Sequence, residues 1–291
     1  MQGGPMSQFG LALASGILYG LSLLLTTIGL TLLFGVGRVV NFAHGAIYAL
    51  GAFLGASLAP LIGFAAAVIV VPVLIAVCAI VLERTVIRRL RRISEMTILL
   101  FTFGLGIVVE ALLVMVWGGY SYTVHMPALL LGSFTFLGGQ MPIYAVFLAF
   151  ISLAIAGFLI AGLHLTQFGL RVRAASEDPA TAEIAGVDVE RIFSWVFAMG
   201  SALAALSGVL VVPFVGASSG MAQPITVLVF IIVIAGGLGS ILGTIIASLL
   251  VGIVVTLGAT YASSAAYLVL FATVIVVLLF RPYGLVESRA E

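Results

Sequence analysis

The sequence predicts an all-α protein that crosses a membrane about eight or nine times, folded as one domain over residues 1–291. Two observations lead to this prediction. Of the 291 residues, 63% are hydrophobic and only 7% are charged, whereas charged residues make up about 25% of a typical soluble domain. The hydrophobic residues also form repeated runs of about 17–25 residues, the length with which an α-helix crosses a bilayer. We therefore expect a polytopic membrane protein surrounded by lipid.

The individual spans follow from these apolar runs in chain order. The first run has no basic segment before it, so we expect a retained span and not a cleaved signal peptide. The candidate spans are Phe9–Phe34, Asn41–Pro60, Gly63–Leu82, Met96–Trp117, Pro142–Leu163, Ile192–Val215, Pro224–Leu238, Ile241–Leu257 and Ala262–Phe280.

The arginines predict which ends of the spans face the cytoplasm. Ten of the eleven lie in two charged segments, about residues 83–95 and 164–191, and in the tail that begins at Arg281. The positive-inside rule places all three in the cytoplasm, which makes the loop of about residues 118–141 external. Counting back through the first spans puts the N-terminus outside. If Gly35–His44 re-enters the membrane instead of turning around, the count becomes eight and the N-terminus moves inside.

The sequence argues against an enzyme. It contains no GxSxG, HExxH or P-loop motif, and its three histidines lie on separate segments. A metalloenzyme needs clustered ligands and an intramembrane protease needs a nucleophile with its base. We expect no catalytic residue, no metal site and no cofactor bound by this chain. No basic domain is present to bind nucleic acid.

The stretch Gly35–Gly55 combines glycines with polar side chains inside an apolar run. Arg38, Asn41 and His44 would share one face if the stretch were helical. Polar groups are costly in hydrocarbon and typically mark a pathway or a site. Two interpretations stay open: contact with a substrate, or a buried polar cluster that satisfies a broken backbone. With nine spans, Arg38 is instead an anchor at the cytoplasmic interface.

A second glycine-rich stretch, Gly236–Gly243, lies in the other half of the chain. Transporters often place substrate near broken helices in corresponding halves of the fold. Close helix packing through small residues is the alternative. The candidates for a translocation pathway or a helix break are Arg38, Asn41, Phe42, His44, Gly45, Gly236, Gly237, Gly239 and Ser240.

Glu110 is the other charged residue within a span. A carboxylate in hydrocarbon needs a partner, and Arg38 is a candidate for this intramembrane pairing. A protonated, hydrogen-bonded Glu110 is the alternative.

The cytoplasmic segment 164–191 contains a short helix. Asp178 followed by Pro179 is typical of a helix start, and Gly186 is typical of its end. Two turns are too short to be stable alone in water, so we expect the helix to pack against another element. It is either an ordinary surface helix or a helix docked into a partner protein. Asp188 is expected to cap the following span.

Three stretches together resemble a known family. They are GLTLLFGVGRVVNFAHGAIYALGAF from Gly29, GLRVRAASEDPATAEIAGVDVERIFSWVFAMGSALAALSGVL from Gly169, and GGLGSILGTIIASLLVGIV from Gly236. In order and spacing they resemble the permease subunits of bacterial branched-chain amino acid ABC importers, of the LivH type. The resemblance runs from about Gly16 to Gly284.

This resemblance implies an ATP-driven importer in the bacterial cytoplasmic (inner) membrane. A periplasmic binding protein would deliver the substrate, and this chain with a second, homologous permease subunit would form the pathway. Two cytoplasmic ATPase subunits would bind ATP and Mg. The implied cargo is a branched-chain or related amino acid, and the alternative is urea, a short amide or an aromatic acid. An ion-coupled secondary carrier would have only Glu110 as an intramembrane acid.

The resemblance also implies that the loop from Arg171 to Arg191 couples this chain to an ATPase. Its single helix would transmit nucleotide-driven closure to the spans. For Arg171 and Arg173, the alternative is that they anchor the loop to lipid headgroups at the membrane surface. The implied coupling residues are Arg171, Arg173, Ala174, Glu177, Asp178, Pro179, Ala182 and Gly186.

Overall fold

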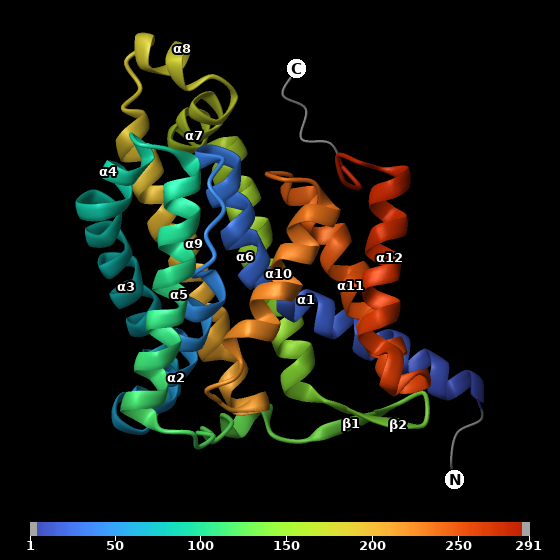
Figure 1. Cartoon of the computed structure of the whole chain (residues 1–291). Helices are drawn as coiled ribbons and strands as arrows, with labels where there is room; N and C mark the ends of the chain where they lie inside the picture. The colour runs from blue at the N-terminus through green and yellow to red at the C-terminus, as the bar shows by residue number, and fades with distance from the viewer. Residues whose placement is uncertain (1–4, 287–291) are drawn as a thin grey trace.

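The protein is a bundle of long α-helices with one small β-hairpin, as seen in a computed structural model that describes residues 5–286 (Figure 1). The long helices are α1 (Pro5–Gly37), α2 (His44–Ile62), α3 (Phe64–Leu82), α5 (Glu95–Trp117), α6 (Ile143–Leu165), α9 (Val189–Val215), α10 (Ala222–Gly236), α11 (Ile241–Tyr261) and α12 (Ala266–Phe280). The shorter elements are a π-helix (Glu83–Ile87), α4 (Arg88–Arg91), two 3-10 turns (Ala128–Leu130 and Ser263–Ala265), β1 (Ser133–Phe136), β2 (Gly139–Pro142), α7 (Gln167–Glu177) and α8 (Pro179–Ile184).

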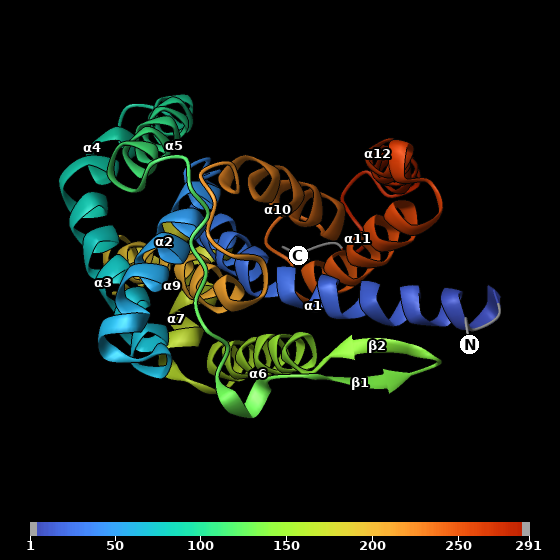
Figure 2. The same ribbon diagram turned by 90° about the horizontal axis from the view of Figure 1, so that it is seen from below.

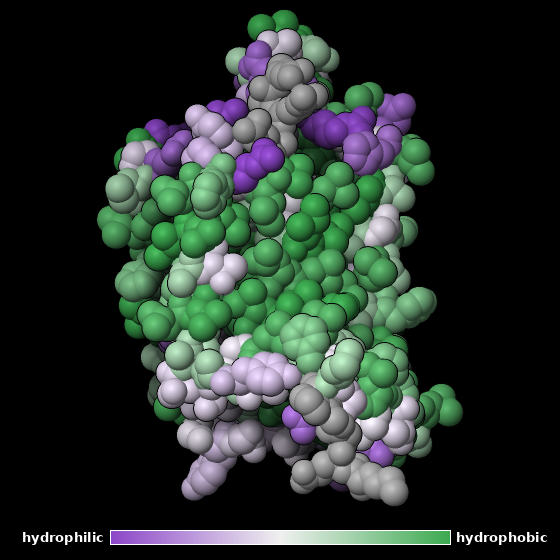
Figure 3. All heavy atoms as spheres, turned by 90° about the vertical axis from the view of Figure 1, so that its right-hand side faces the viewer, coloured by the Kyte–Doolittle hydropathy of each residue, from purple (hydrophilic) through white to green (hydrophobic). Residues whose placement is uncertain are grey.

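The prediction of an all-α polytopic membrane protein is confirmed. Within residues 5–286, eight helices are long and apolar enough to cross a membrane, and α10 is a shorter apolar helix. Figure 3 shows the face formed around α12, where a broad apolar band separates polar groups at the two ends of the molecule. Such a band suits the hydrocarbon layer of a bilayer. The exposed side chains of α12 include Leu268, Phe271, Ile275 and Leu279.

α1 runs from the end that carries the β-hairpin to the opposite, arginine-rich end. Its first turns pack on the hairpin, where a Cβ on Gly139 would lie 2.2 Å from Leu11 Cδ2. At its other end, the Ser176 hydroxyl of α7 donates a hydrogen bond to the Gly35 carbonyl. α2 then returns to the hairpin end, where Trp117 Nε1 donates to Ser57 Oγ at 2.7 Å. The chain therefore turns around between α1 and α2, as the count of nine spans requires.

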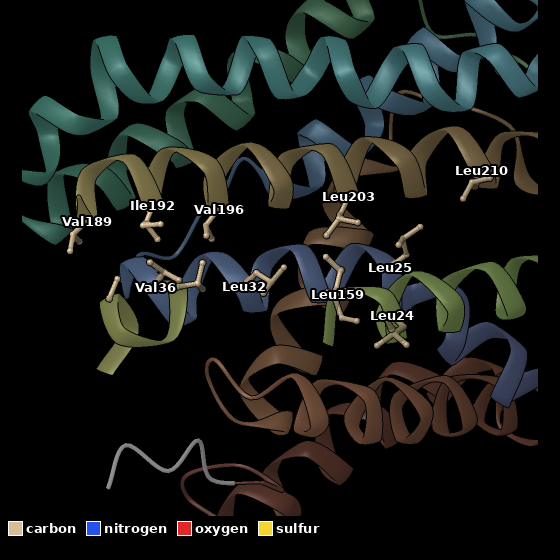
Figure 4. Close-up of a cluster of buried hydrophobic side chains, with 14 of the residues drawn as sticks. Leu24, Leu25, Leu32, Val36, Leu159, Val189, Ile192, Val196, Leu203 and Leu210 are labelled. Atoms are coloured by element: carbon tan, nitrogen blue, oxygen red, sulfur yellow. The ribbon is translucent and has the colours of Figure 1, made fainter. Parts of the chain in front are cut away.

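α9 lies at the centre of the bundle. Over an apolar stretch of 18 residues in α9, 72% of the residues are buried, whereas only 11% are buried over a stretch of the same length in the last span. Small residues make this possible because they let backbones approach closely. A Cβ on Gly208 would lie 2.1 Å from the Tyr48 carbonyl oxygen of α2, and one on Gly200 would lie 2.6 Å from the Gly29 carbonyl oxygen of α1. The apolar side of α9 packs with α1 and α6, and its labelled side chains face those two helices in Figure 4.

The charged segment 83–95 is largely a helical extension of the third span. The π-helix and α4 continue α3 almost without interruption. Glu83 is completely buried, and it accepts hydrogen bonds from the Ser194 hydroxyl of α9 and from Arg88, whose Nη2 lies 3.3 Å from Oε2. A buried carboxylate needs such partners. These contacts hold the extension against α9, a helix that lies far along the chain.

Candidate functional site

The chain between α1 and α2 is broken, not helical. Residues 38–43 have no regular secondary structure, and Arg38 has a φ of +48°, in the left-handed region. The condition under which Arg38, Asn41 and His44 would share one helical face is therefore not met. Arg38 is exposed at the arginine-rich end of α1, whereas Asn41 and His44 each expose 1% of their surface.

Asn41 satisfies a backbone group of the break, and His44 attaches the start of α2 to α1. Asn41 Oδ1 accepts a hydrogen bond from the Ala43 N–H at 3.1 Å. His44 Nε2 lies 2.8 Å from the Thr26 carbonyl oxygen, and since a carbonyl can only accept, Nε2 carries the proton. Thr26 lies roughly three turns before the end of α1, so this bond fixes the start of α2 well inside the bundle. The Phe42 N–H donates to Thr102 Oγ1 of α5 at 3.2 Å.

A groove of about 430 Å³ lies beside the break, between α2, α5 and α10. Seen from the hairpin end, α5 and α10 lie along the upper edge of Figure 2, and α2 lies nearer the centre of the molecule. Each long helix contributes one stripe of residues at helical spacing. The lining residues are Phe42 and Ala46 beside the break, Phe103, Gly106, Ile107 and Glu110 of α5, and Gln223, Thr226, Val227, Phe230, Ile231 and Ile234 of α10.

Two glycines bring the break close to both neighbouring helices. A Cβ on Gly45 would lie 1.9 Å from Thr226 Oγ1 of α10. Gly106 of α5 faces the Phe42 carbonyl oxygen, which lies 3.5 Å from the position of a Cβ. The Phe42 ring packs on Phe230, with ring centroids 4.7 Å apart. Of the pathway candidates in the broken segment, Phe42 therefore lies in the wall of the groove. Asn41 and His44 are not part of this wall, and their side chains bond backbone groups instead.

Glu110 faces the groove without a protein partner. No hydrogen bond or ion pair joins it to another residue between 5 and 286. The expected pairing with Arg38 is absent, since Arg38 is at the exposed end of α1. The sequence reasoning missed Gln223 and Thr226. The sequence does contain a signal for them. Thr226, Val227 and Phe230 follow Gln223 by three, four and seven residues, and this spacing places all four on one face of a helix.

The stretch Gly236–Gly243 is the tight turn between α10 and α11, outside the groove lining. Gly237 and Gly239 have φ values of +105° and +86°, which a residue with a Cβ rarely adopts. Ser240 caps α11, with its hydroxyl accepting from the Gly243 N–H at 3.1 Å. A Cβ on Gly239 would lie 3.1 Å from Gly35 Cα, so the two glycine-rich stretches meet at the arginine-rich end. Close packing accounts for these residues.

The segment before α9 holds two helices, not the single one expected. α7 precedes α8, and α8 runs from Pro179 as the sequence predicts. Asp178 caps α8 by accepting hydrogen bonds from the Ala180 N–H at 3.0 Å and the Thr181 N–H at 3.2 Å. The Thr181 hydroxyl and these N–H groups hold the pKa of Asp178 below its usual range. Gly186 ends α8 with a φ of +85°.

α8 packs through one small residue and exposes the rest. Ala182 is buried, whereas the Ile184 side chain is 88% exposed. α7 buries Val172 and Ala175 and leaves Ala174 half-buried. The other coupling candidates at this end of the molecule are exposed or half-exposed: Arg171, Arg173, Glu177, Asp178, Pro179 and Gly186. Asp188 caps α9 as expected, since its Oδ1 accepts from the Arg191 N–H at 2.9 Å.

Comparisons with known proteins identify the family. A family model described as "Branched-chain amino acid transport system / permease component" matches residues 12–279. The high-affinity branched-chain amino acid transport system permease protein BraD of Pseudomonas aeruginosa is 28% identical, over 94% of each chain. The corresponding LivH protein of Escherichia coli is 26% identical over 93% of each chain. A probable branched-chain amino acid transport permease protein LivH of Methanocaldococcus jannaschii is 29% identical, over 94% of this chain and 91% of its own.

No solved structure matches this chain. The family match runs from α1 to the end of α12 and so covers nearly all of the eight helices that are long and apolar enough to cross a membrane, together with α10. The chain belongs to the family of permease components of branched-chain amino acid transport systems, and it is a multi-pass transmembrane transport subunit.

Proposed function

We propose that this chain is one permease subunit of an ATP-driven ABC importer for branched-chain or related amino acids. The observation that carries the proposal is the family match over residues 12–279, in a chain built almost wholly of membrane-crossing helices. A periplasmic binding protein delivers the substrate at the hairpin end, which is external together with the start of α1. The arginine-rich end faces the cytoplasm of a bacterial inner membrane.

The groove between α2, α5 and α10 forms this subunit's half of the translocation pathway. It is lined by polar groups on two helices that are otherwise apolar, and polar groups in hydrocarbon typically mark a pathway. A second permease subunit, a homologue of this chain, closes the groove. Asn41 and His44 serve the pathway indirectly, by fixing the broken segment that carries Phe42.

α7 and α8 couple the spans to one of two cytoplasmic ATPase subunits. A two-turn helix is unstable alone, and α8 has only one buried residue, Ala182, so a docked partner would supply the missing contacts. The hydrogen bond from Ser176 to the Gly35 carbonyl connects α7 directly to the end of α1. ATP and Mg are held by the ATPase subunits, and this chain binds neither. Motion of the docked helices then shifts the spans between inward-open and outward-open states.

Reconstitution tests this function. The chain is inserted into proteoliposomes with its partner permease and its ATPase subunits, and uptake of radiolabelled L-leucine is measured with the binding protein outside and ATP inside. We expect uptake only when hydrolysable ATP and intact ATPase subunits are present. The control complex carries ATPase subunits with an inactivated Walker motif. Equal uptake by the control complex would contradict an ATP-driven importer.

A further inference from the structure

We propose that the groove binds the amino acid itself, with the Glu110 carboxylate holding the substrate's α-ammonium group and the phenylalanines holding its side chain. The proposal rests on the importer function above and assigns residues of the groove to the parts of its cargo: Glu110 to the α-ammonium group, and the phenylalanines to the apolar side chain.

The charge of Glu110 is the first argument. Glu110 lies roughly four turns after the start of α5 and two turns before its end, and every residue between Glu95 and Trp117 other than Glu110 is uncharged. A carboxylate in such a position is stabilised by a cation or a set of donors. No other residue in the described chain, 5–286, gives it either. The ammonium group of a substrate in the groove would supply the missing cation.

The shape of the groove is the second argument. Phe103 and Glu110 lie on the same face of α5 about 10 Å apart, as do Phe230 and Gln223 on α10, because seven residues make two turns. The groove thus has a polar end at Glu110, Gln223 and Thr226, and an aromatic end. At the aromatic end, Phe42 packs on Phe230 and meets Phe103 edge to face at a centroid distance of 6.1 Å.

A free amino acid with an apolar side chain likewise has a charged end and an apolar end. Its ammonium group would pair with Glu110, its carboxylate would accept from the amide of the exposed Gln223, and its side chain would lie against the rings. The volume of about 430 Å³ falls within the roughly 300–1,000 Å³ of small-molecule sites. Urea and aromatic acids lack a cationic group, so they leave Glu110 unpaired. The groove therefore favours amino acids over these alternatives.

The test compares Glu110→Gln, Glu110→Asp and a matched control, Glu95→Gln, in the complete reconstituted importer. Glu95 is the same residue type on the same helix, but it is exposed at the start of α5 and outside the groove. ATP-dependent uptake is measured for L-leucine, urea and benzoate, and the yield of assembled complex is measured for each variant.

For the wild type we expect uptake of L-leucine and not of urea or benzoate. Because a charge-assisted pair is lost, Glu110→Gln should lower leucine uptake at limiting substrate by about tenfold or more. Glu110→Asp keeps the charge and should retain part of the uptake. Glu95→Gln should stay within roughly twofold of the wild type. All three variants should assemble in wild-type amounts.

Three results would overturn the proposal while leaving ATP-driven import by the complex intact. They are wild-type leucine uptake by Glu110→Gln, failure of Glu110→Gln to assemble with the second permease, and ATP-dependent uptake of urea or benzoate without leucine. Failure to assemble would assign Glu110 to the contact between permease subunits. Absence of ATP-dependent uptake of any of the three compounds would instead overturn the importer function, and the proposal with it.

Discussion

Single glycines decide how closely the central helices approach one another. Gly208 of α9 lies where a Cβ would be 2.1 Å from the Tyr48 carbonyl oxygen of α2. Backbone atoms cannot move aside as a flexible side chain can, so an added methyl group must push the two helices apart. The close contacts of α9 are therefore sensitive to one carbon atom.

Gly208→Ala should consequently lower the free energy of unfolding by about 1–3 kcal/mol, the usual cost of overpacking a well-packed interior. Thermal unfolding of the purified protein in detergent measures this. The matched control is Gly157→Ala in α6, where a Cβ meets no atom within 4 Å. There the change should be neutral or slightly stabilising because alanine is the better helix former. Equal melting temperatures for the two variants would contradict the packing assignment.

The sequence predicted part of the site at this scale. Asn41 and His44 stood out because buried polar groups are costly, and the structure gives each a hydrogen bond. The separation of Arg38 from them was not predictable, because it depends on one left-handed backbone angle in a residue other than glycine. The surroundings of Glu110 were not predictable either, since α10 reaches the groove only through the packing of the whole bundle.

At the scale of the elements, the formation of helix α8 depends on the residues at its two ends. Asp178 begins the helix with hydrogen bonds to two backbone N–H groups, and Gly186 ends it in a conformation that side chains with a Cβ rarely adopt. The space around Gly186 is open, since a Cβ there meets no atom within 4 Å. Any effect of a substitution at Gly186 must therefore come from its backbone conformation.

Gly186→Val should abolish substrate-stimulated ATP hydrolysis by the reconstituted complex while the chain still inserts into the membrane. The left-handed conformation costs a residue with a Cβ about 1–2 kcal/mol, a large amount for a two-turn helix. Gly186→Asn is the matched control, because asparagine tolerates this conformation, and it should keep most of the stimulation. Unchanged stimulation in Gly186→Val would count against docking of α8 on an ATPase.

α7 shows why the cytoplasmic elements were only partly predictable. Its apolar residues are few, and it buries only Gly169, Val172 and Ala175. A Cβ on Gly169 would lie 2.2 Å from the Leu163 carbonyl oxygen, so this glycine lets α7 fold back on the end of α6. A glycine near a helix start usually lowers the expectation of a helix. Tertiary packing reverses that expectation here.

At the scale of the whole molecule, the fold predicts which segments lie on the same side of the membrane. The first turns of α1 lie with the β-hairpin, and α7 and α8 lie at the opposite end (Figure 1). Within residues 5–286, eight helices long enough to cross a membrane and the shorter helix α10 connect these ends.

Single cysteines should therefore react from opposite sides of the membrane. In a Cys78→Ser background, Met6→Cys and Leu129→Cys should react with a membrane-impermeant thiol reagent in intact cells. Both positions are strongly exposed, at 89% and 94%. Ala180→Cys, on the exposed face of α8, should react only after the membrane is permeabilised, in cells that make the chain without its ATPase subunits. Labelling of Met6→Cys from the side of Ala180→Cys would rule out nine crossings.

At this scale the sequence was most informative about the number and order of helices. A segment in hydrocarbon must satisfy its own backbone hydrogen bonds, so an apolar run of sufficient length becomes a helix. The sequence was least informative about which helix is central. α9 and α12 are both apolar, but small residues of α9 such as Gly200 and Gly208 let it approach α1 and α2 closely.

The path of α1 has a mechanical consequence. One continuous helix contacts the hairpin through Leu11 near its start and α7 through Gly35 near its end. Gly35 also rests on Gly239 in the turn between α10 and α11. The hydrogen-bonded backbone of α1 between these contacts is stiff. A displacement of one end of this helix would therefore also move its other end. A displacement of α7 would therefore be passed both to the hairpin and to the α10 wall of the groove.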